Sequence, residues 1–398
     1  MNVIGRDETS TRSADADHRP QSVRSDLALH LGAFLARDGS DGAPVGVDTN
    51  SPHAAVVFGK RGTGKSYTLG VIAEGLAGSP GVAPIVVDPM GVFGGLTAAG
   101  GQVVAPAIRP AALPAPAWPE LVGLDPTSGP GSLLWQVVAD AVGATGREPI
   151  DDADETDAPD GNGGEECVTG SNSGERLSHG SPSIDCLLRA VSDADAPPST
   201  RRVVRNHLRL ADSWNVFDAD SPPVASFTRG GRPTVVDLAG VPEAAAAAVV
   251  RAIARGLYDA RIAGEVERLP WLLIDEAHAF FGGVADPALR TLLTRGRAPG
   301  VSLVCATQRP GSLPSVVVSQ SDLLVAHRLT AAPDVERLAA AEATYLAGDL
   351  ASRLPTGTGE ALVVDDATET VHTVRIRERR TPHGGESPTA SRVDVDDE

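Results

Sequence analysis

The stretch "GKRGTGKSYT", residues 59–68, restricts the fold more than any other part of the sequence. It contains the pattern G-x-x-x-x-G-K-S at residues 59–66, between the apolar run "AAVVF" and the helical pattern "SYTLGVIAEGLA". Glycines at these positions let backbone N–H groups converge on phosphate oxygens, and the N-terminus of the following helix adds positive potential. A strand, a phosphate-binding loop and a helix are therefore expected here.

Lysine usage supports this interpretation. Of the 34 lysines and arginines in the chain, only Lys60 and Lys65 are lysines. A compact ammonium contacts phosphate differently from a planar guanidinium, so Lys65 is predicted to reach the β- and γ-phosphates of ATP and Ser66 to ligate Mg²⁺. Lys60 either contacts nucleotide or has no specific role. The predicted nucleotide-binding residues of the loop are Gly59, Lys60, Arg61, Gly62, Thr63, Gly64, Lys65, Ser66 and Tyr67.

The charge balance is strongly acidic. The chain of 398 residues is 41% hydrophobic, enough for a substantial core, and has a formal net charge of −18. This resembles the proteins of salt-adapted archaea; arginine-favouring codons in a GC-rich genome are the alternative explanation. An acidic surface argues against nucleic-acid binding, but molar salt shortens the screening length to about 3 Å, so that local patches decide.

Cysteine spacing and hydropathy argue against a disulfide-rich, a zinc-binding or a membrane protein. Cys167, Cys186 and Cys305 show neither a CxxC pair nor metal-ligand spacing, so no disulfide framework and no zinc site are expected. No apolar run approaches the roughly 18 residues of a membrane span, and no basic start precedes an apolar segment. A cytoplasmic location without membrane contact is the prediction.

Composition predicts the domain organisation. Residues 1–22 and the acidic tail 379–398 are polar and are expected to be disordered, outside the core. The ATPase domain is predicted at 23–378, interrupted by a mostly helical insertion at 97–230. Within the insertion, residues 151–176 contain nine carboxylates against one arginine and are predicted to be a disordered loop.

Short β-branched runs alternate with longer helical patterns. The first six strand candidates are continuously apolar, as in strands covered on both faces, which predicts an α/β domain with a mainly parallel sheet. The predicted strands are 54–59, 83–89, 234–240, 271–277, 301–308, 322–329, 361–366 and 371–377. The predicted helices are 65–77, 131–143, 183–193, 199–212, 242–262, 286–295 and 332–342.

The strand "WLLIDEAH", residues 271–278, ends in two carboxylates. Asp275 is suited to hold Mg²⁺ and Glu276 to orient or deprotonate the attacking water. An ordinary polar strand end is the alternative. His278 completes the letters of DEAH-box helicases, but the downstream "CATQRP" lacks their serine-alanine-threonine motif, so we interpret the four letters as incidental.

Polar residues elsewhere provide candidates for sensing and for action between subunits. Gln308, at the end of "VSLVCATQ", is the candidate γ-phosphate sensor, and a solvent-facing strand end is the alternative. Arg295 and Arg297 either reach a neighbouring subunit's nucleotide or cap their own helix.

Together these segments resemble the HerA/FtsK superfamily of P-loop ATPases, closest to archaeal HerA-like proteins. The resemblance covers roughly residues 50–96 and 230–378. It rests on "GKRGTGKSYTLGVIAE", "PIVVDP", "TVVDLAGV", "LLIDEAHAFF", "RGRAPGVSLVCATQRP", "SQSDLLVAHRL" and "LPTGTGEALVVDD", in that order. It implies a RecA-like core, a ring that is commonly hexameric, ATP hydrolysis across subunit boundaries, translocation along double-stranded DNA and a nuclease partner.

The resemblance also assigns roles to individual positions. Asp88 matches an acidic position that supports the active site, and Arg297 is the leading candidate for an arginine finger acting in trans. After Asp88 the sequence "PMGVF" departs from the histidine and glutamate usual in relatives. The other matches are Lys65 and Ser66 in the phosphate loop, Asp275 and Glu276 as the hydrolytic pair, and Gln308 as the sensor.

Two functions compete at this stage. The first is an ATP-driven motor on duplex DNA, to which the arginines of "RRVVRNHLR", residues 201–209, would contribute phosphate contacts if they are not paired with carboxylates. The second is an ATP-dependent regulatory or assembly protein without motor activity. A GTPase is disfavoured because the chain has no NKxD motif, and a small-molecule kinase because Glu276 beside Asp275 suits water activation better than transfer.

Overall fold

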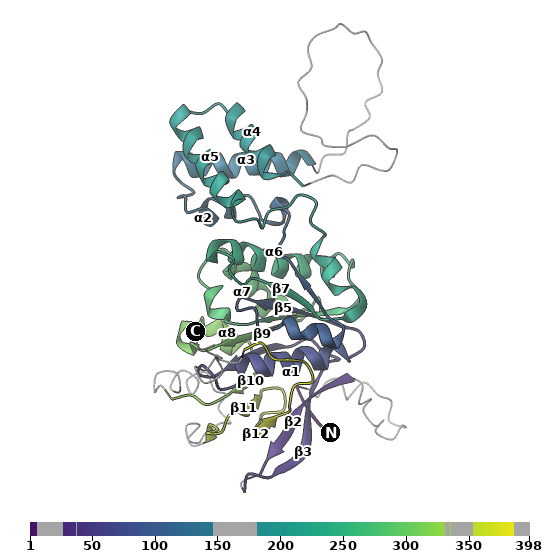
Figure 1. Ribbon diagram of the computed structural model, residues 1–398. Coiled ribbons are helices and arrows are strands. Elements are labelled where there is room, and N and C mark those ends of the chain that lie inside the picture. Colours follow the sequence, from purple (N-terminus) through teal and green to yellow (C-terminus); the bar gives the residue numbers. More distant parts are fainter. Residues whose placement is uncertain (6–26, 37, 146–180, 331–334, 336–352, 386–398) are drawn as a thin grey trace, which may run out of the picture. The chain divides into compact units, whose positions relative to one another are not determined.

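The computed structural model describes residues 1–5, 27–36, 38–145, 181–330, 335 and 353–385. The chain divides into two compact units (Figure 1). Unit 1 comprises Met1–Pro106 and Val224–Glu398, and unit 2 comprises Ala107–Pro223. The insertion predicted at 97–230 therefore begins about ten residues before unit 2 and ends about seven residues after it.

Unit 1 is built around one sheet. Among the described residues, its strands lie in the order β1-β3-β2-β12-β11-β10-β4-β9-β8-β5-β7-β6. Every neighbouring pair from β10 to β6 is parallel, whereas the strands from β10 through β11, β12 and β2 to β3 are antiparallel. The strands are β1 (Asn2–Ile4), β2 (Ala28–Leu35), β3 (Asp41–Asp48), β4 (Ala54–Phe58), β5 (Val82–Asp88), β6 (Gln102–Val104), β7 (Thr234–Asp237), β8 (Leu269–Ile274), β9 (Ser302–Thr307), β10 (Leu323–Ala326), β11 (Glu360–Asp365) and β12 (Thr370–Ile376).

Helices cover both faces of the parallel strands. On one face, Leu69 and Leu76 of α1 belong to the same buried cluster as Val57 of β4 and Val304 of β9. Because side chains alternate along a strand, Val56 points to the other face, and it too is fully buried. Figure 1 shows α6 and α7 on that side. The helices of unit 1 are α1 (Lys65–Ala77), α6 (Glu243–Ile262), α7 (Asp286–Arg295) and α8 (Ser315–Ser319).

The structure confirms the predicted α/β class with a mainly parallel sheet. All eight predicted strands are present, and so are six of the seven predicted helices. The seventh prediction, 332–342, lies almost wholly outside the described residues, as does the predicted acidic loop 151–176.

Three strands before the phosphate loop, β1, β2 and β3, were not predicted from the sequence. Strands β2 and β3 form a hairpin whose outer strand, "DGAPVGVD", contains glycine, proline and aspartate, residues that are depleted in strands. Pairing of β2 with β12 places this hairpin in the sheet, so Gly32 lies beside Ile376, which is distant in sequence.

The expectation that residues 1–22 and 379–398 lie wholly outside the core was wrong for the parts that the structure describes. Ile4 is 5% exposed, in a strand that pairs with β3. Thr381 is 6% exposed, and the Arg379 side chain only 2%. Both segments are polar in composition, but each meets a partner supplied by a distant part of the chain.

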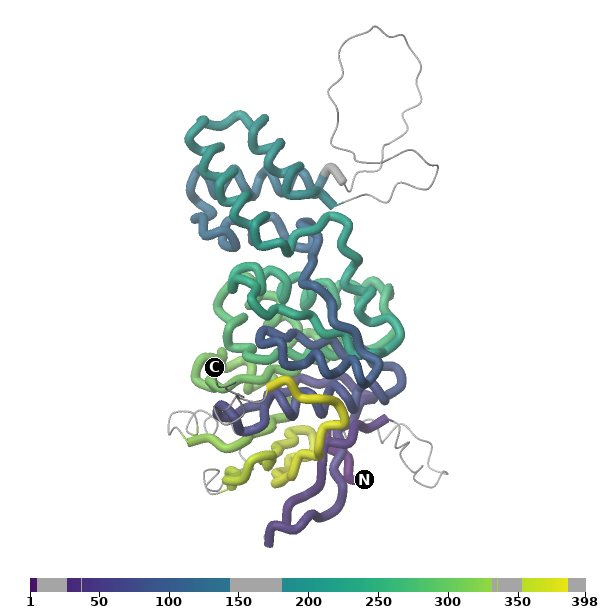
Figure 2. The backbone as a smooth tube through the Cα atoms, in the orientation of Figure 1, coloured from purple at the N-terminus to yellow at the C-terminus, as the bar shows by residue number. Residues whose placement is uncertain are grey.

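The C-terminal segment, residues 377–385, runs along helix α1 (Figure 2). Its anchor is Glu74 of α1, whose side chain is 3% exposed. Glu74 Oε1 accepts hydrogen bonds from the Thr381 backbone N–H at 2.9 Å and the Thr381 hydroxyl at 2.6 Å, and Oε2 accepts one from Arg377 Nη1 at 2.8 Å. Burial alone would raise the pKa of Glu74, but these donors outweigh it and hold the pKa below its usual value.

Replacing Glu74 is therefore expected to destabilise the fold. We expect Glu74→Gln to lower the free energy of unfolding at neutral pH by about 3 kcal/mol, because Arg377 and Arg379 lose their buried counter-charge. Since the folded-state pKa is depressed, this stabilisation is present above the unfolded pKa and disappears as the pH falls through the folded one. Urea unfolding at pH 7 and pH 3.5 measures the loss of stability and its dependence on pH. The exposed Glu378→Gln is the control. Equal free energies of unfolding for the Glu74 and Glu378 variants at pH 7 would contradict the role given to Glu74.

Unit 2 is helical, as predicted. Trp118 is fully buried and stacks on Phe217 with ring centroids 5.0 Å apart. Arg201 donates to the backbone oxygens of Ser192 and Ala194, so this member of the predicted basic face is engaged within the unit. Its helices are α2 (Ala117–Leu121), α3 (Gly129–Thr145), α4 (Ile184–Asp193) and α5 (Pro198–Asp212).

Two sequence expectations concern cysteines and membranes. Cys305 is a free, buried thiol, and Cys167 lies outside the described residues. None of the helices in the described part of the chain has the length and apolar character to cross a bilayer.

Candidate nucleotide-binding and hydrolysis site

The loop between β4 and α1 requires its glycines. A Cβ on Gly59 would lie 2.5 Å from Thr63 Oγ1 and 2.7 Å from His327 Cβ, so no side chain fits there. Gly62 and Gly64 have φ values of +77° and +113°, which side chains rarely adopt. The predicted phosphate-binding loop is therefore present as a tight glycine turn at the carboxyl end of a central strand.

Lys65 lies inside this loop. It is 5% exposed, and its Nζ donates to the Lys60 carbonyl at 3.1 Å. Burial lowers the pKa of Lys65, while the charges of Glu276 and Asp275 act in the opposite direction. The ammonium is thus held by one neutral oxygen, which a phosphate oxygen could replace.

The other predicted residues of the loop differ in exposure and contacts. Lys60 Nζ donates to Thr330 Oγ1 at 2.8 Å, and Arg61 is exposed. The Tyr67 hydroxyl accepts a 2.6 Å hydrogen bond from the Arg379 backbone, which ties the phosphate-loop helix to the C-terminal segment. The Thr63 hydroxyl donates to the Lys60 carbonyl at 2.8 Å and closes the turn.

Ser66 and Asp275 meet although 209 residues separate them. Ser66 Oγ donates to Asp275 Oδ2 at 2.7 Å, and Asp275 is fully buried. Burial raises the pKa of Asp275, and the hydrogen bond from Ser66 and the charge of Lys65 counteract part of that rise. A hydroxyl and a carboxylate are ligands that suit Mg²⁺, which ordinarily takes its remaining ligands from phosphates and water.

No cluster of three or more His, Cys, Asp or Glu side chains within the described residues could hold a metal ion.

Glu276 has an unusual backbone. Its φ of 47° and ψ of 40° lie in the left-handed region, which costs a non-glycine residue about 1 kcal/mol or more. Its Oε2 is buried without a hydrogen-bond partner in the described part of the chain. Strain and a buried carboxylate oxygen without a hydrogen bond, directly after Asp275, are consistent with the predicted role in water activation.

Strand β9, which carries the candidate sensor at its end, lies between β4 and β8. Thr307, at its end, is fully buried, and the following Gln308 is half-buried. The role of Gln308 as a γ-phosphate sensor remains a prediction.

Two histidines of the site were not predicted. His278 Nδ1 is 3.1 Å from Thr307 Oγ1 and 3.3 Å from Glu276 Oε2, and burial, followed by the charge of Arg309, lowers its pKa. His327 bonds Thr68 of α1 through Nε2 at 2.9 Å, and burial lowers its pKa to about 4. Single histidines after strands have no characteristic spacing, so the sequence offers no signal for either role.

Asp88 organises the chain after β5. It is 1% exposed and accepts backbone N–H groups of Met90 at 3.2 Å, Val92 at 3.1 Å and Phe93 at 2.8 Å. Burial raises the pKa of Asp88, and these three donors act against the rise. Asp88 therefore fixes the turn that carries the divergent "PMGVF" sequence, while direct contact with nucleotide remains a prediction.

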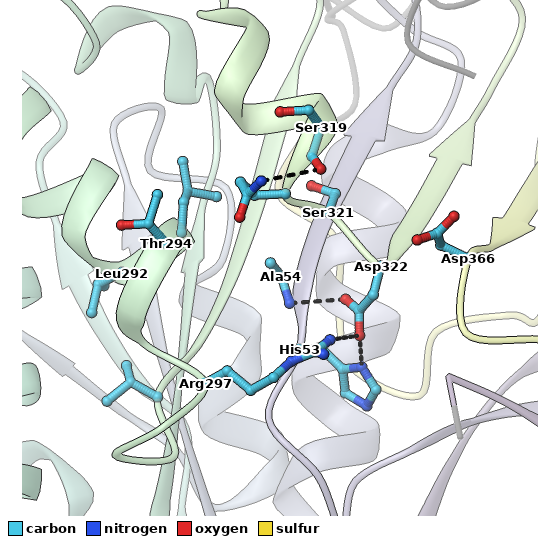
Figure 3. Close-up of a pocket in the computed structure, with 12 residues that line it drawn as sticks. His53, Ala54, Leu292, Thr294, Arg297, Ser319, Ser321, Asp322 and Asp366 are labelled. Atoms are coloured by element: carbon cyan, nitrogen blue, oxygen red, sulfur yellow. Dashed lines mark hydrogen bonds and ion pairs between the residues drawn. The ribbon is translucent and has the colours of Figure 1, made fainter. Parts of the chain in front are cut away.

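Arg297 lies near the amino ends of the parallel strands, whereas the phosphate loop lies at their carboxyl ends. Its Nη2 is 3.1 Å from Asp322 Oδ2, which also accepts a 2.7 Å hydrogen bond from His53 Nδ1 (Figure 3). Asp322 also binds the backbone N–H of Ala54, where β4 begins, whereas the phosphate loop follows the other end of that strand. Arg297 is thus remote from its own chain's loop, and a role in trans remains a prediction.

The cavity beside Arg297 has a volume of about 240 Å³. Arg297 is 66% exposed there, so its side chain is accessible from outside the protomer. Arg295 ends α7 and is also exposed.

The parallel strands, the glycine loop after β4 and the acidic pair after β8 define the fold of a RecA-like P-loop ATPase. The family model described as "Helicase HerA, central domain" matches residues 29–257, more than half of the chain, and the chain belongs to this family. The comparison with curated proteins gave no match.

Solved structures share the fold. VirB4 of Thermoanaerobacter pseudethanolicus is 16% identical over 90% of this chain and 98% of that chain, with a TM-score of 0.64. The bacterial conjugative coupling protein TrwBΔN70, in its unbound monoclinic form, is 15% identical over 89% of this chain and 96% of that chain, with a TM-score of 0.52. At such identities the likeness establishes the architecture alone.

Proposed function

We propose that this protein hydrolyses ATP with Mg²⁺ and uses the energy to move along double-stranded DNA. One observation carries the hydrolytic part: the 2.7 Å hydrogen bond from Ser66 to Asp275, which joins the phosphate loop to the acidic pair. Membership of the HerA family supports the motor part.

Each residue of the site has a separate role in the proposed hydrolysis. Backbone N–H groups of residues 62–66 and the Lys65 ammonium bind the β- and γ-phosphates. Mg²⁺, held by Ser66 and Asp275, supplies charge neutralisation at the phosphates. Glu276 accepts a proton from the attacking water, and Gln308 senses the γ-phosphate from the neighbouring strand end.

A ring assembly, a hexamer in our proposal, completes the site. Arg297 extends from the sheet edge remote from its own loop, so it would serve the nucleotide of the next protomer. Double-stranded DNA is the proposed substrate of the motor. A nuclease partner rests on the resemblance to HerA-like proteins alone.

Mixing two inactive variants tests the trans arrangement. Lys65→Ala lacks a working loop and Arg297→Ala lacks the finger, so each alone is expected to lose most ATPase activity. After subunit exchange, sites that combine an intact loop with an intact Arg297 of the neighbour should recover phosphate release. The absence of recovery in verified mixed oligomers would contradict the proposed trans role.

Phosphate release in molar KCl, measured with and without duplex DNA alongside the mass from light scattering, tests the motor proposal. We expect hydrolysis that rises with DNA, from an oligomer. Monomeric protein whose ATPase rate ignores DNA at every salt concentration would instead favour an ATP-dependent regulatory or assembly protein, in which nucleotide orders a complex.

A further inference from the structure

Three polar side chains meet where β8 and β9 end. His278 Nδ1 lies 3.3 Å from Glu276 Oε2 and 3.1 Å from Thr307 Oγ1. The His278 and Glu276 side chains are only 15% and 21% exposed, and Thr307 is fully buried. In so shielded a place, a polar contact is stronger than at the surface.

The partners of Nδ1 determine where the imidazole proton lies. A carboxylate oxygen accepts hydrogen bonds only, so a bare Nδ1 lone pair beside Glu276 would be repelled. Thr307 Oγ1 already accepts the Arg309 backbone N–H at 3.0 Å and has room for a second donor. We therefore assign the ring proton to Nδ1, facing both Glu276 and Thr307.

The backbone brings the histidine back to the glutamate. The left-handed conformation of Glu276 begins the short 3₁₀ helix Ala277–Ala279, which places residue 278 beside residue 276. The contact does not meet the geometry of a hydrogen bond, since Glu276 Oε2 has no such partner among the described residues. The imidazole thus attracts and orients the carboxylate without forming a hydrogen bond to Oε2.

We propose that His278 is a positioning residue that fixes Glu276 for water activation and connects it, through Thr307, to the strand that ends beside Gln308. A change at the γ-phosphate that moves the end of β9 would then reach Glu276 through one side chain. This inference rests on the proposed ATP hydrolysis with Glu276 as the base.

Three substitutions at position 278 test it. His278→Asn keeps a polar group near the Nδ1 position, whereas His278→Gln places it near the Nε2 position and His278→Leu removes it. We expect the Gln and Leu variants to lower kcat about 10- to 100-fold with an unchanged KM for ATP, because a misplaced base affects the chemical step alone. The Asn variant should retain a kcat within about threefold of the wild type.

A second comparison separates positioning from general structural support. In the Glu276→Gln background there is no base to position, so adding His278→Gln should leave the single-turnover rate of phosphate release unchanged. A further loss in that background would overturn the proposal, as would a wild-type kcat in the Gln and Leu variants or an equal loss in all three. If the wild-type protein itself releases no phosphate, the proposed function fails instead, which is a different result.

Discussion

Glu276→Gln should bind ATP as well as the wild type does, yet hydrolyse it about 10²- to 10⁴-fold more slowly. The amide is nearly isosteric with the carboxylate but cannot accept a proton from water. Because Glu276 Oε2 has no hydrogen-bond partner in the described part of the chain, this exchange breaks no hydrogen bond of that oxygen. Steady-state phosphate release and nucleotide-binding titrations measure the two halves of the prediction.

The result for Glu276 separates catalysis from folding. A matched control is Glu378→Gln, which makes the same chemical change at an exposed position outside the site. Equal kcat values for the Glu276 and Glu378 variants would show that the acidic pair does not activate water.

Lys65→Ala should weaken ATP binding about 10- to 100-fold, since a charge-assisted contact to phosphate contributes roughly 1.5–3 kcal/mol. Lys65 is 5% exposed and lies within the glycine turn, where its ammonium binds the Lys60 carbonyl. The Lys65→Ala variant should also lose ATP hydrolysis. Fluorescent-nucleotide binding at a fixed Mg²⁺ concentration measures the effect.

Lys60, the only other lysine of the chain, provides the control substitution for Lys65→Ala. Lys60 Nζ binds Thr330 Oγ1 at 2.8 Å, and it is the Lys60 backbone carbonyl that contacts the Lys65 ammonium. Lys60→Ala is therefore expected to weaken binding much less than Lys65→Ala. Equal losses at the two lysines would mean that binding depends on loop charge in general rather than on the buried ammonium.

The phosphate loop could be predicted because its determinants are local. The strand, the glycines and the helix lie within residues 54–77, and each is required by the backbone of its neighbours. The meeting of Ser66 with Asp275 was also foreseeable, because parallel strands bring their carboxyl ends to one edge of the sheet.

The parts that escaped prediction depend on pairing between distant segments. The β2/β3 hairpin owes its place to β12, about 340 residues further along the chain. The C-terminal segment is held by Glu74, which in sequence looks like any helical glutamate. A polar composition predicts disorder only when no partner exists elsewhere, and a single sequence does not reveal that partner.

His278 shows what a motif comparison leaves out. The letters DEAH are interpreted as incidental because the downstream motif of DEAH-box helicases is missing. That comparison does not bear on the contacts of the residue. Those contacts follow from the left-handed turn at Glu276 and from the end of β9 at Thr307, neither of which a residue pattern encodes.

Calorimetric titration of the wild-type protein with ATP, in molar KCl with and without Mg²⁺, tests most directly whether the loop and the acidic pair form a nucleotide site. The account predicts saturable binding that is tighter with Mg²⁺, because Ser66 and Asp275 share the ion with the phosphates. Absence of binding under both conditions, or the same affinity with and without Mg²⁺, would contradict it.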